Sequence, residues 1–286
     1  ICNLKCRICT SFASSKWAEE EEKLELAPPG HGDRMIKMGK WPKENDNFWS
    51  DLYEVSNDVE VLELFGGEPM VLKEHALYLK QIVDSGTAGN KVISYNTNGT
   101  QDMSRFYEQW KHFKKVELFI SIDGIDKVTE FIRYPSKFSV IEDNLRKYDD
   151  NSSENMSFKI LYTVQALNIF YLPEFADWLE SQNYKKIMVK KKHDTIFHTG
   201  TLWGPHYLSA KILPLHVKEV ITKKLTDYVE EKKDTLNVSN FTQMVNLMNS
   251  EDNSSLMEEF DEYLIKMDLY RNLNHKKTFE ELFNLF

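Results

Sequence analysis

The chain has three cysteines, at positions 2, 6 and 9, and no other cysteine follows in its 286 residues. Three thiolates separated by three and then two residues can surround one compact metal centre, but they supply one ligand fewer than a closed four-cysteine site. In a cubane cluster, three protein ligands leave one iron open, and an open position distinguishes a reactive metal site from a structural one. The spacing therefore predicts an iron–sulfur cluster with one open iron, held by Cys2, Cys6 and Cys9.

Composition limits the classes of protein to which the chain can belong. Hydrophobic residues make up 41% and charged residues 28% of the chain, and no apolar run approaches the roughly 20 residues that span a bilayer. The net charge of −9 opposes sequence-independent binding to nucleic acid, which relies on clustered Lys and Arg. Three crowded cysteines do not form an even disulfide framework. We therefore expect a cytoplasmic protein with reduced thiols and with neither a membrane nor a nucleic acid as partner.

Between residues 58 and 192, short apolar runs alternate with amphipathic stretches, as in βα units around a parallel sheet. The predicted strands are Glu60–Phe65, Val92–Asn96, Val116–Ile122, Phe158–Val164 and Lys186–Val189. The helices predicted between them are Lys73–Ser85, Ser104–Phe113, Phe138–Tyr148 and Leu172–Gln182. Residues 10–47 are less regular, and we expect a loop and one helix there. From about Thr195 the strand pattern ends, so we expect a core domain over residues 1–194 and a mostly helical extension over 195–286.

Helical patterns recur along this C-terminal extension. They cover Leu213–Lys232, Phe241–Asn249, Leu256–Leu269 and Thr278–Leu285. The six tryptophans are expected to pack in the core or at its rim rather than to bind a substrate. They are Trp17, Trp41, Trp49, Trp110, Trp178 and Trp203.

Small polar residues and glycine follow three successive predicted strands. The three segments are Gly66-Gly67-Glu68-Pro69, Asn96-Thr97-Asn98-Gly99 and Ser121-Ile122-Asp123-Gly124. In parallel α/β folds ligands bind at the carboxyl ends of strands, and adjacent glycines let a ligand approach the backbone closely. Each segment alone is also explained as an ordinary turn. Their succession favours one binding edge of the sheet.

With these later segments, the chain resembles the radical S-adenosylmethionine enzymes over residues 1–192. Residues 2–9 have the family's cysteine spacing, with the apolar Ile8 before the last cysteine, and the segments GGEP, TNG and SIDG follow in the family's order. The resemblance implies a 4Fe–4S cluster whose open iron binds S-adenosylmethionine. It also implies reductive cleavage to a 5′-deoxyadenosyl radical that abstracts hydrogen from a substrate. The implied fold is α/β, a partial (β/α)6 TIM-like barrel, here without its first strand upstream of Cys2.

The resemblance also implies roles for individual residues. Cys2, Cys6 and Cys9 would bind the cluster. The residues that would contact S-adenosylmethionine are Ile8, Gly66, Gly67, Glu68, Asn96, Asn98, Ser121 and Arg133. Of these, Ile8 would pack near the adenine, the glycines and Glu68 would meet the methionine amino group, and Ser121 and Arg133 would hold its carboxylate. A planar bidentate donor such as Arg133 suits a carboxylate.

Two further positions at this edge are less well defined. Asp123 could contact the cofactor or fix the turn before Gly124, and Asn96 and Asn98 could contact either the ribose or the methionine portion. No general base or quenching acid stands out. The candidates beyond the last predicted strand are His193, Asp194 and His198.

The residues around the cysteines resemble the branch of the family that carries SPASM or twitch auxiliary-cluster domains, whose usual substrates are peptides or protein side chains. Such domains need further cysteines, and none follows Cys9. The resemblance implies a reductant protein such as flavodoxin or ferredoxin. A radical S-adenosylmethionine activase or an enzyme of nucleoside precursors would keep every motif and change only the substrate.

The residues alone leave other interpretations open. A zinc site completed by His31 or His75 would make the chain a zinc-stabilised partner-binding protein, Ser121 could satisfy local backbone, and Arg133 could form a surface ion pair. The chain begins with Ile1 and enters its first motif at the next residue. We therefore expect a fragment cut at its N-terminus, whose cysteine loop holds a cluster poorly.

Overall fold

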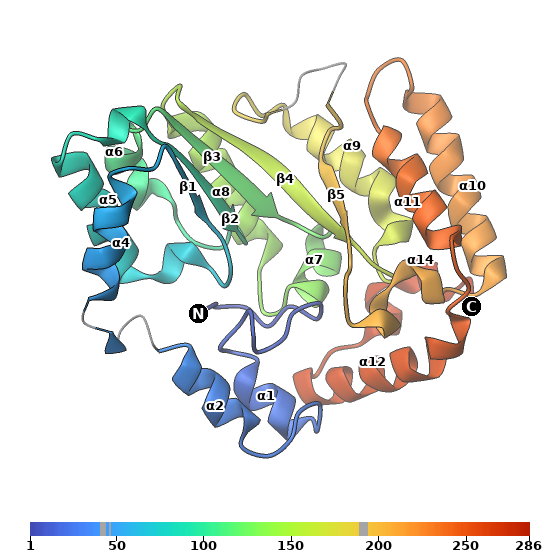
Figure 1. The fold of residues 1–286 in the computed structure, drawn as a ribbon. Helices are drawn as coiled ribbons and strands as arrows, with labels where there is room; N and C mark the ends of the chain where they lie inside the picture. Colours follow the sequence, from blue (N-terminus) through green and yellow to red (C-terminus); the bar gives the residue numbers. More distant parts are fainter. Residues whose placement is uncertain (41–43, 46, 189–193) are drawn as a thin grey trace. The chain divides into compact units, whose positions relative to one another are not determined.

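The computed structural model describes residues 1–40, 44–45, 47–188 and 194–286, and its five strands form one sheet in the order of the chain (Figure 1). The strands are β1 Val61–Leu64, β2 Val92–Thr97, β3 Lys115–Ser121, β4 Met156–Val164 and β5 His198–Thr201. The pairs β1/β2, β2/β3 and β4/β5 are parallel. Parallel neighbours require crossover connections, which are largely helical here. The predicted α/β class with a parallel sheet is confirmed.

The chain divides into two compact units, each built from several segments. The first unit comprises Ile1–Ser121, Pro135–Lys159 and Tyr184–Met188. The second comprises Ile122–Tyr134, Ile160–Asn183 and Val189–Phe286. The chain passes between the units within β4, so neither unit is one continuous stretch of sequence. The domain boundary after residue 194 stays a prediction.

Both units contain helices. Those of the first unit are α1 Ala18–Lys23, α2 His31–Met38, α4 Phe48–Ser56, α5 Lys73–Asp84, α6 Tyr107–Trp110 and α8 Phe138–Asn151. Those of the second are α7 Asp126–Ile132, α9 Leu172–Gln182, α10 Leu215–Lys232, α11 Ser239–Asn249, α12 Met257–Arg271, α13 His275–Thr278 and α14 Glu280–Phe283. None of the helices in the described ranges is long and apolar enough to cross a membrane.

The strands bury alternate residues, so the sheet has a helix-packed face and a half-exposed face. Along β3 and β4, every second residue is buried and its neighbours are half-buried or exposed. In the first unit the buried Phe158 of β4 packs against Tyr148 of α8, with ring centroids 6.0 Å apart. In the second unit Tyr162 of β4 packs against Phe175 of α9 at 4.9 Å. The half-exposed face is left for polar residues, including Ser121 at the end of β3.

Four of the five predicted strands are found within two residues of their predicted ends, and the fifth is found only as a parallel bridge to β4. Within the predicted strand Lys186–Val189, only Ile187 forms a bridge, with Phe158, and Val189 lies outside the described residues. The N–H of Phe158 donates to the carbonyl of Lys186 at 3.0 Å and the N–H of Met188 to the carbonyl of Phe158 at 2.7 Å. The N–H of Lys186 donates to the Asp149 carboxylate at 2.7 Å. The strand beside β4 is β5, within a region where no strand was expected. Its sequence His-Thr-Gly-Thr has little strand propensity, so pairing with β4 decides its conformation.

Some helices also differ from prediction. The segment Ser104–Phe113 begins as a 3-10 turn, Ser104–Phe106, before the short α6, and α7 was not predicted. The predicted helix Thr278–Leu285 is divided into α13 and α14 by Phe279. The buried ring of Phe279 packs against Phe131, with centroids 5.1 Å apart, and this contact holds Phe279 outside the helical conformation. Residues 10–40 form two helices rather than one, because the Glu22 carboxylate accepts N–H groups of Gly30 and Gly32 in the turn between α1 and α2.

The tryptophans divide between core and surface. Trp17 and Trp110 are fully buried, and the half-buried Trp178 packs against Phe175. Trp203 is 91% exposed, so the expectation that every tryptophan packs is wrong there. Trp41 lies outside the described residues.

A buried aromatic group in the first unit includes a neutral histidine. Nε2 of His75 and the hydroxyl of Tyr95 form a hydrogen bond of 3.0 Å, and Nε1 of Trp110 donates to the same hydroxyl at 3.0 Å. Burial, with a smaller contribution from the charge of Arg105, lowers the pKa of His75 from 6.5 to about 4. His75 is therefore engaged in the core, which argues against its proposed role in a zinc site.

This lowered pKa predicts acid sensitivity of the fold. In the unfolded chain His75 gains a proton below pH 6.5, whereas in the folded chain it stays neutral until about pH 4. The stabilisation is fully present above pH 6.5 and is lost as pH falls through this window, by about 2–4 kcal/mol. Urea unfolding at several pH values should show this loss, and His75→Phe should reduce it. The exposed His112 is the control: a His112→Gln variant should keep the wild-type pH dependence, and an equal dependence in the His75 variant would contradict the assignment.

Candidate functional site

The cysteine loop, residues 1–11, gathers its three thiols into one cluster of side chains. Cys2 and Cys6 are buried with Leu4, and the half-buried Ile8 and Cys9 pack against them. The backbone N–H of Cys9 donates to the carbonyl of Cys6 at 3.0 Å, a turn that brings the last two cysteines together. Ile8, expected near an adenine, packs on the thiols.

A single buried carboxylate joins the turn after β1 to the turn after β2. Oε1 of Glu68 accepts hydrogen bonds from the Thr97 hydroxyl at 2.8 Å and from the Met70 N–H at 3.1 Å, and Oε2 accepts from the Asn98 N–H at 2.7 Å. The N–H of Glu68 donates to the carbonyl of Ile1 at 2.8 Å. Segments separated by about a hundred residues of chain therefore meet at Glu68.

The two glycines of this turn have different surroundings. Both adopt positive φ, +83° at Gly66 and +56° at Gly67, which favours glycine at each. A Cβ on Gly67 would lie 2.1 Å from the carbonyl oxygen of Ile1, whereas a Cβ on Gly66 would have no neighbour within 4 Å. Gly67 thus allows the cysteine loop to lie against the turn, and Gly66 leaves open space beside the backbone.

Asn98 connects the second turn to the first cysteine. Its Nδ2 donates to Oδ1 of Asn3 at 2.9 Å and points at Sγ of Cys2 at 3.9 Å, and the Leu4 N–H donates to the same sulfur at 3.5 Å. Burial raises the pKa of the Cys2 thiol, and the Leu4 N–H opposes this shift. Donors aimed at a cysteine sulfur suit a cluster thiolate, since such hydrogen bonds tune iron–sulfur sites.

The donor set fits a 4Fe–4S cluster in kind. Three thiols within one loop, with N–H donors around the first sulfur, supply the ligand chemistry that such a cluster takes. Within the described ranges, no three His, Cys, Asp or Glu side chains are arranged as a group that could hold a single metal ion. Nε2 of His31, the other proposed zinc ligand, lies 2.9 Å from the Ser11 hydroxyl and 3.5 Å from the Glu21 carboxylate.

Two further predicted residues of the first unit lie at the carboxyl ends of neighbouring strands. Asn96 is exposed near the end of β2 and is in register with Phe119 of β3. Ser121 is half-buried and is the last residue of β3. Asn96, Asn98, Ser121 and Glu68 thus belong to the same edge of β1–β3, as the sequence predicts.

The second unit holds a buried ion pair formed by two of the residues singled out in the sequence. Nε of Arg133 lies 2.8 Å from the carboxylate of Asp123, and both side chains are buried. The other oxygen of Asp123 accepts from the Thr163 N–H at 2.8 Å. Burial raises the pKa of Asp123, and the Arg133 charge opposes the shift. Arg133 therefore does not form a surface ion pair, and Asp123 anchors the start of this unit.

Gln165 is a candidate that the sequence interpretation missed. It directly follows β4, is fully buried, and neither its amide nitrogen nor its amide oxygen has a hydrogen-bond partner within the described part of the chain. Its backbone is fixed, since its N–H donates to Oδ1 of Asn168 at 2.8 Å. An unpaired buried polar group costs about 1–3 kcal/mol, so a bound molecule is one source of its missing partner. The sequence signal that could have found Gln165 is its position directly after the fourth predicted strand.

Two of the three proposed acid–base candidates lie within the described residues. Asp194 is half-buried, and His198 is exposed as the first residue of β5. His193 lies outside the described residues.

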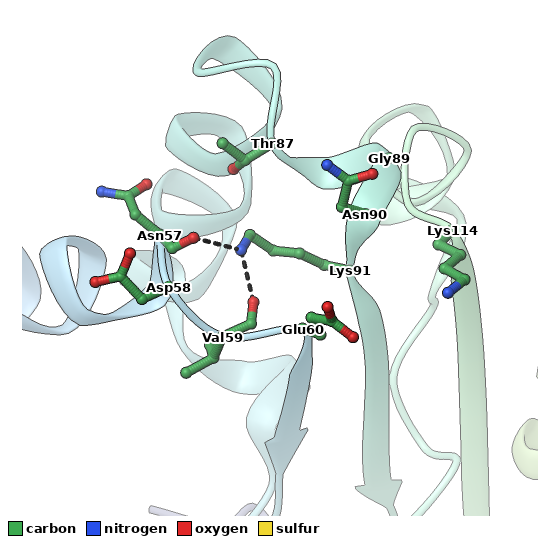
Figure 2. Close-up of a pocket in the computed structure, with 9 residues that line it drawn as sticks. All are labelled: Asn57, Asp58, Val59, Glu60, Thr87, Gly89, Asn90, Lys91 and Lys114. Atoms are coloured by element: carbon green, nitrogen blue, oxygen red, sulfur yellow. Dashed lines mark hydrogen bonds between the residues drawn. The ribbon is translucent and has the colours of Figure 1, made fainter.

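A polar pocket of about 450 Å³ lies at the opposite ends of the strands of the first unit (Figure 2). It is lined by residues that precede β1, β2 and β3. They are Asn57, Asp58, Val59, Glu60, Thr87, Gly89, Asn90, Lys91 and Lys114. Nζ of the buried Lys91 donates to the carbonyls of Ser56, Asn57 and Val59 at 2.6, 3.3 and 2.7 Å. Lys91 therefore holds the loop before β1, and the chemistry-bearing residues lie at the other edge.

Comparison with known proteins bears on this arrangement. No family model and no curated protein matches the chain. Native anSMEcpe with bound AdoMet aligns with a TM-score of 0.51 and 17% identity, covering 88% of this chain and 65% of that protein. The chain therefore shares the fold of anSMEcpe. The predicted partial TIM-like barrel is thereby confirmed.

Other solved structures were also found. Native anSMEcpe with bound AdoMet and Kp18Cys peptide gives the same TM-score of 0.51, with 17% identity and coverage of 88% and 65%. SuiB of Streptococcus suis bound to S-adenosylmethionine gives a TM-score of 0.42 and 15% identity, covering 81% of this chain and 43% of that one. The chain spans 65% of the length of anSMEcpe, which is less than two thirds.

The two glycines of the GGEP turn provide a matched test of how the cysteine loop packs. Gly66→Ala should cost only the strain of a left-handed residue, about 1–2 kcal/mol. Gly67→Ala adds a collision with Ile1, so it should lower the free energy of unfolding by more than Gly66→Ala does. It should also speed amide exchange at Glu68 by at least about tenfold. Urea unfolding and hydrogen exchange measure the two effects. Equal losses in the two variants would show that the loop does not lie against Gly67.

The buried pair in the second unit should show strong coupling. Arg133→Met leaves the Asp123 carboxylate buried without its counter-charge and should lower the unfolding free energy by about 3–5 kcal/mol at pH 7. Because the pKa of Asp123 is already raised, its neutral form is the one that burial favours, and the loss should shrink as pH falls. In a double-mutant cycle with Asp123→Asn, the combined loss should be well below the sum of the single losses. Additive losses would exclude the pair.

Proposed function

We propose that the chain is a radical S-adenosylmethionine enzyme. Cys2, Cys6 and Cys9 would hold a 4Fe–4S cluster, and S-adenosylmethionine would bind beside it. When bound, the cluster supplies the electron that cleaves S-adenosylmethionine to a 5′-deoxyadenosyl radical, which abstracts hydrogen from the substrate. The SPASM-like branch and the reductant, a flavodoxin or ferredoxin, belong to the same proposal.

The observation that carries the proposal is the meeting of three sequence segments at Glu68. Turn chemistry explains each glycine-containing segment separately, but it does not require the turn after β1 to bind both the cysteine loop and the turn after β2. Glu68 makes both connections, through its N–H to Ile1 and its carboxylate to Thr97 and Asn98. A cofactor that spans from the thiols to the strand ends would need these segments fixed together.

The residues of the chain have separable tasks in this proposal. The Glu68 carboxylate already accepts three hydrogen bonds from the protein, so its first task is to hold the turn. Gly66, which has open space where a side chain would be, presents backbone to the methionine amino group. Asn96 and Asn98 contact the ribose or methionine portion, and Ser121 and Arg133 bind the carboxylate. Asp123 holds the Arg133 side chain in place through its Nε.

The proposed substrate is a peptide or a protein side chain. The support is the resemblance of residues 1–17 to the peptide-modifying branch, together with the fold shared with anSMEcpe, which has been solved with a peptide. The cytoplasm supplies the reducing conditions that free thiols and a cluster need.

Anaerobic assay of the chain tests the proposal. After reconstitution with iron and sulfide, it should bind about four irons per chain and release 5′-deoxyadenosine when dithionite and S-adenosylmethionine are added. Cys6→Ala should abolish both. Gly67→Val and Arg133→Ala should lower 5′-deoxyadenosine formation by about tenfold or more, since each removes about 1.4 kcal/mol or more of cofactor binding. Substitution of the exposed Arg34 by Ala is the control and should change nothing.

Two results would overturn the proposal. A protein that stays colourless, or that binds zinc without iron or sulfide, is not an iron–sulfur enzyme. If instead the cluster forms but both Gly67→Val and Arg133→Ala keep full 5′-deoxyadenosine formation, the cofactor site is wrongly placed.

A further inference from the structure

The short helix α1 buries acidic side chains that its sequence would place in solvent. Its sequence is Ala-Glu-Glu-Glu-Glu-Lys, and runs of like charge usually form a solvated surface. Glu20 is only 1% exposed and Glu21 only 7%. A buried carboxylate is costly unless it is paired or hydrogen-bonded, so both need partners. Each has a partner on the cysteine loop.

Glu21 fixes the end of the cysteine loop. Its Oε1 accepts a hydrogen bond from the N–H of Ser11 at 2.8 Å, two residues after the last cysteine. His31, at the start of α2, lies beside both groups, since its Nε2 is 2.9 Å from the Ser11 hydroxyl and 3.5 Å from Oε2 of Glu21. Ser11 is thus held at both its backbone and its side chain.

Glu20 and Trp17 fix the middle of the loop. Glu20 forms an ion pair with Lys5, which precedes the second cysteine. Nε1 of the fully buried Trp17 donates to the carbonyl of Cys6 at 2.8 Å. The hydroxyl of Ser14, just before α1, donates to the carbonyl of Leu4. The helix therefore binds the segments on both sides of Cys6.

Glu22 contacts a different part of the molecule. Its carboxylate accepts N–H groups of Gly30 and Gly32 at 2.9 and 3.1 Å, in the turn that leads to α2. Glu20 and Glu21 contact the cysteine loop, whereas their neighbour Glu22 on the same helix does not. Substitution of Glu20 or Glu21 therefore removes a contact with the loop, and substitution of Glu22 removes a contact elsewhere in the unit.

We propose that Trp17, Glu20 and Glu21, here called the α1 clamp, are positioning residues that hold the cysteine loop in its ligand-ready shape before any metal binds. The clamp rests on the proposed function only for the identity of the ligand, a 4Fe–4S cluster. Preorganisation removes the ordering cost from the binding step, so the clamped loop binds a cluster more tightly than a free loop of the same sequence.

The first test uses the metal-free chain. Hydrogen exchange at the Ser11 and Cys9 amides should be at least about tenfold faster in Glu21→Ala than in wild type, because the acceptor of the Ser11 N–H is lost. Glu21→Gln keeps an oxygen acceptor and should retain most of the protection. Glu22→Ala is the matched control: it should speed exchange at Gly30 and Gly32 and leave Ser11 and Cys9 unchanged. Near-ultraviolet circular dichroism verifies that each variant is folded.

The second test uses the reconstituted chain. At limiting iron and sulfide, Glu21→Ala and Glu20→Ala should hold about half the wild-type cluster or less, and the electron paramagnetic resonance signal of the reduced cluster should broaden as the loop loses its single shape. Glu21→Gln should restore both the content and the signal. Glu22→Ala should behave as wild type.

The outcomes separate the clamp from the proposed function. If Glu21→Ala matches Glu22→Ala in both exchange and cluster content while wild type holds a cluster, the clamp is wrong and the proposed function stands. If the exchange differences are found but wild-type chain binds no iron, the proposed function is overturned while the ordering of the loop by α1 is supported. If Glu21→Gln fails to restore protection although it is folded, the Ser11 hydrogen bond is not the contact that orders the loop.

Discussion

The buried carboxylate of Glu68 is the interaction on which the first unit depends. It lies where the turn after β1, the turn after β2 and the first residue of the cysteine loop come together, and it satisfies donors from the first two while its own N–H binds the third. A charged group with 1% exposure is tolerated only when it is fully hydrogen-bonded, so each of these donors is needed. The geometry of the strand ends and the placement of the thiols are therefore coupled through one side chain.

The same principle operates in the second unit with a different pair of groups. Asp123 is buried with Arg133, and its second oxygen and its carbonyl receive hydrogen bonds from Thr163 and Asn168. Removing one partner of such a pair leaves an uncompensated charge, which costs far more than the pair itself contributes. Polar residues at the carboxyl ends of strands therefore stabilise the fold in both units. Gln165 differs from them, because its side-chain amide has no hydrogen-bond partner in the described part of the chain.

The regular part of the fold was predictable, because apolar periodicity and helix-start residues specify α5, α8 and α9 and the first four strands locally. Where prediction failed, long-range contacts decide the structure. β5 has weak strand propensity and exists by pairing with β4, and Phe279 interrupts a helical pattern because its ring packs on Phe131. The cysteines and glycines could be found from their types and spacing. The burial of Glu20 and Glu21 could not be predicted, because a run of acidic residues usually indicates a solvent-exposed surface unless the partners of those residues are known.

The indole of Trp17 and the carboxylate of Glu21, which hold the cysteine loop, also bear on how cluster binding and folding would be related. In small zinc domains the metal supplies the folding free energy, so the metal-free chain is unfolded and open to proteolysis. Here the backbone of Cys6 is bound by Trp17, and that of Ser11 by Glu21, with no metal involved. If the chain holds the proposed 4Fe–4S cluster, these contacts, made by protein groups alone, would keep the loop in place when the cluster is lost to oxygen. Refilling would then require iron, sulfide and electrons but no second round of folding.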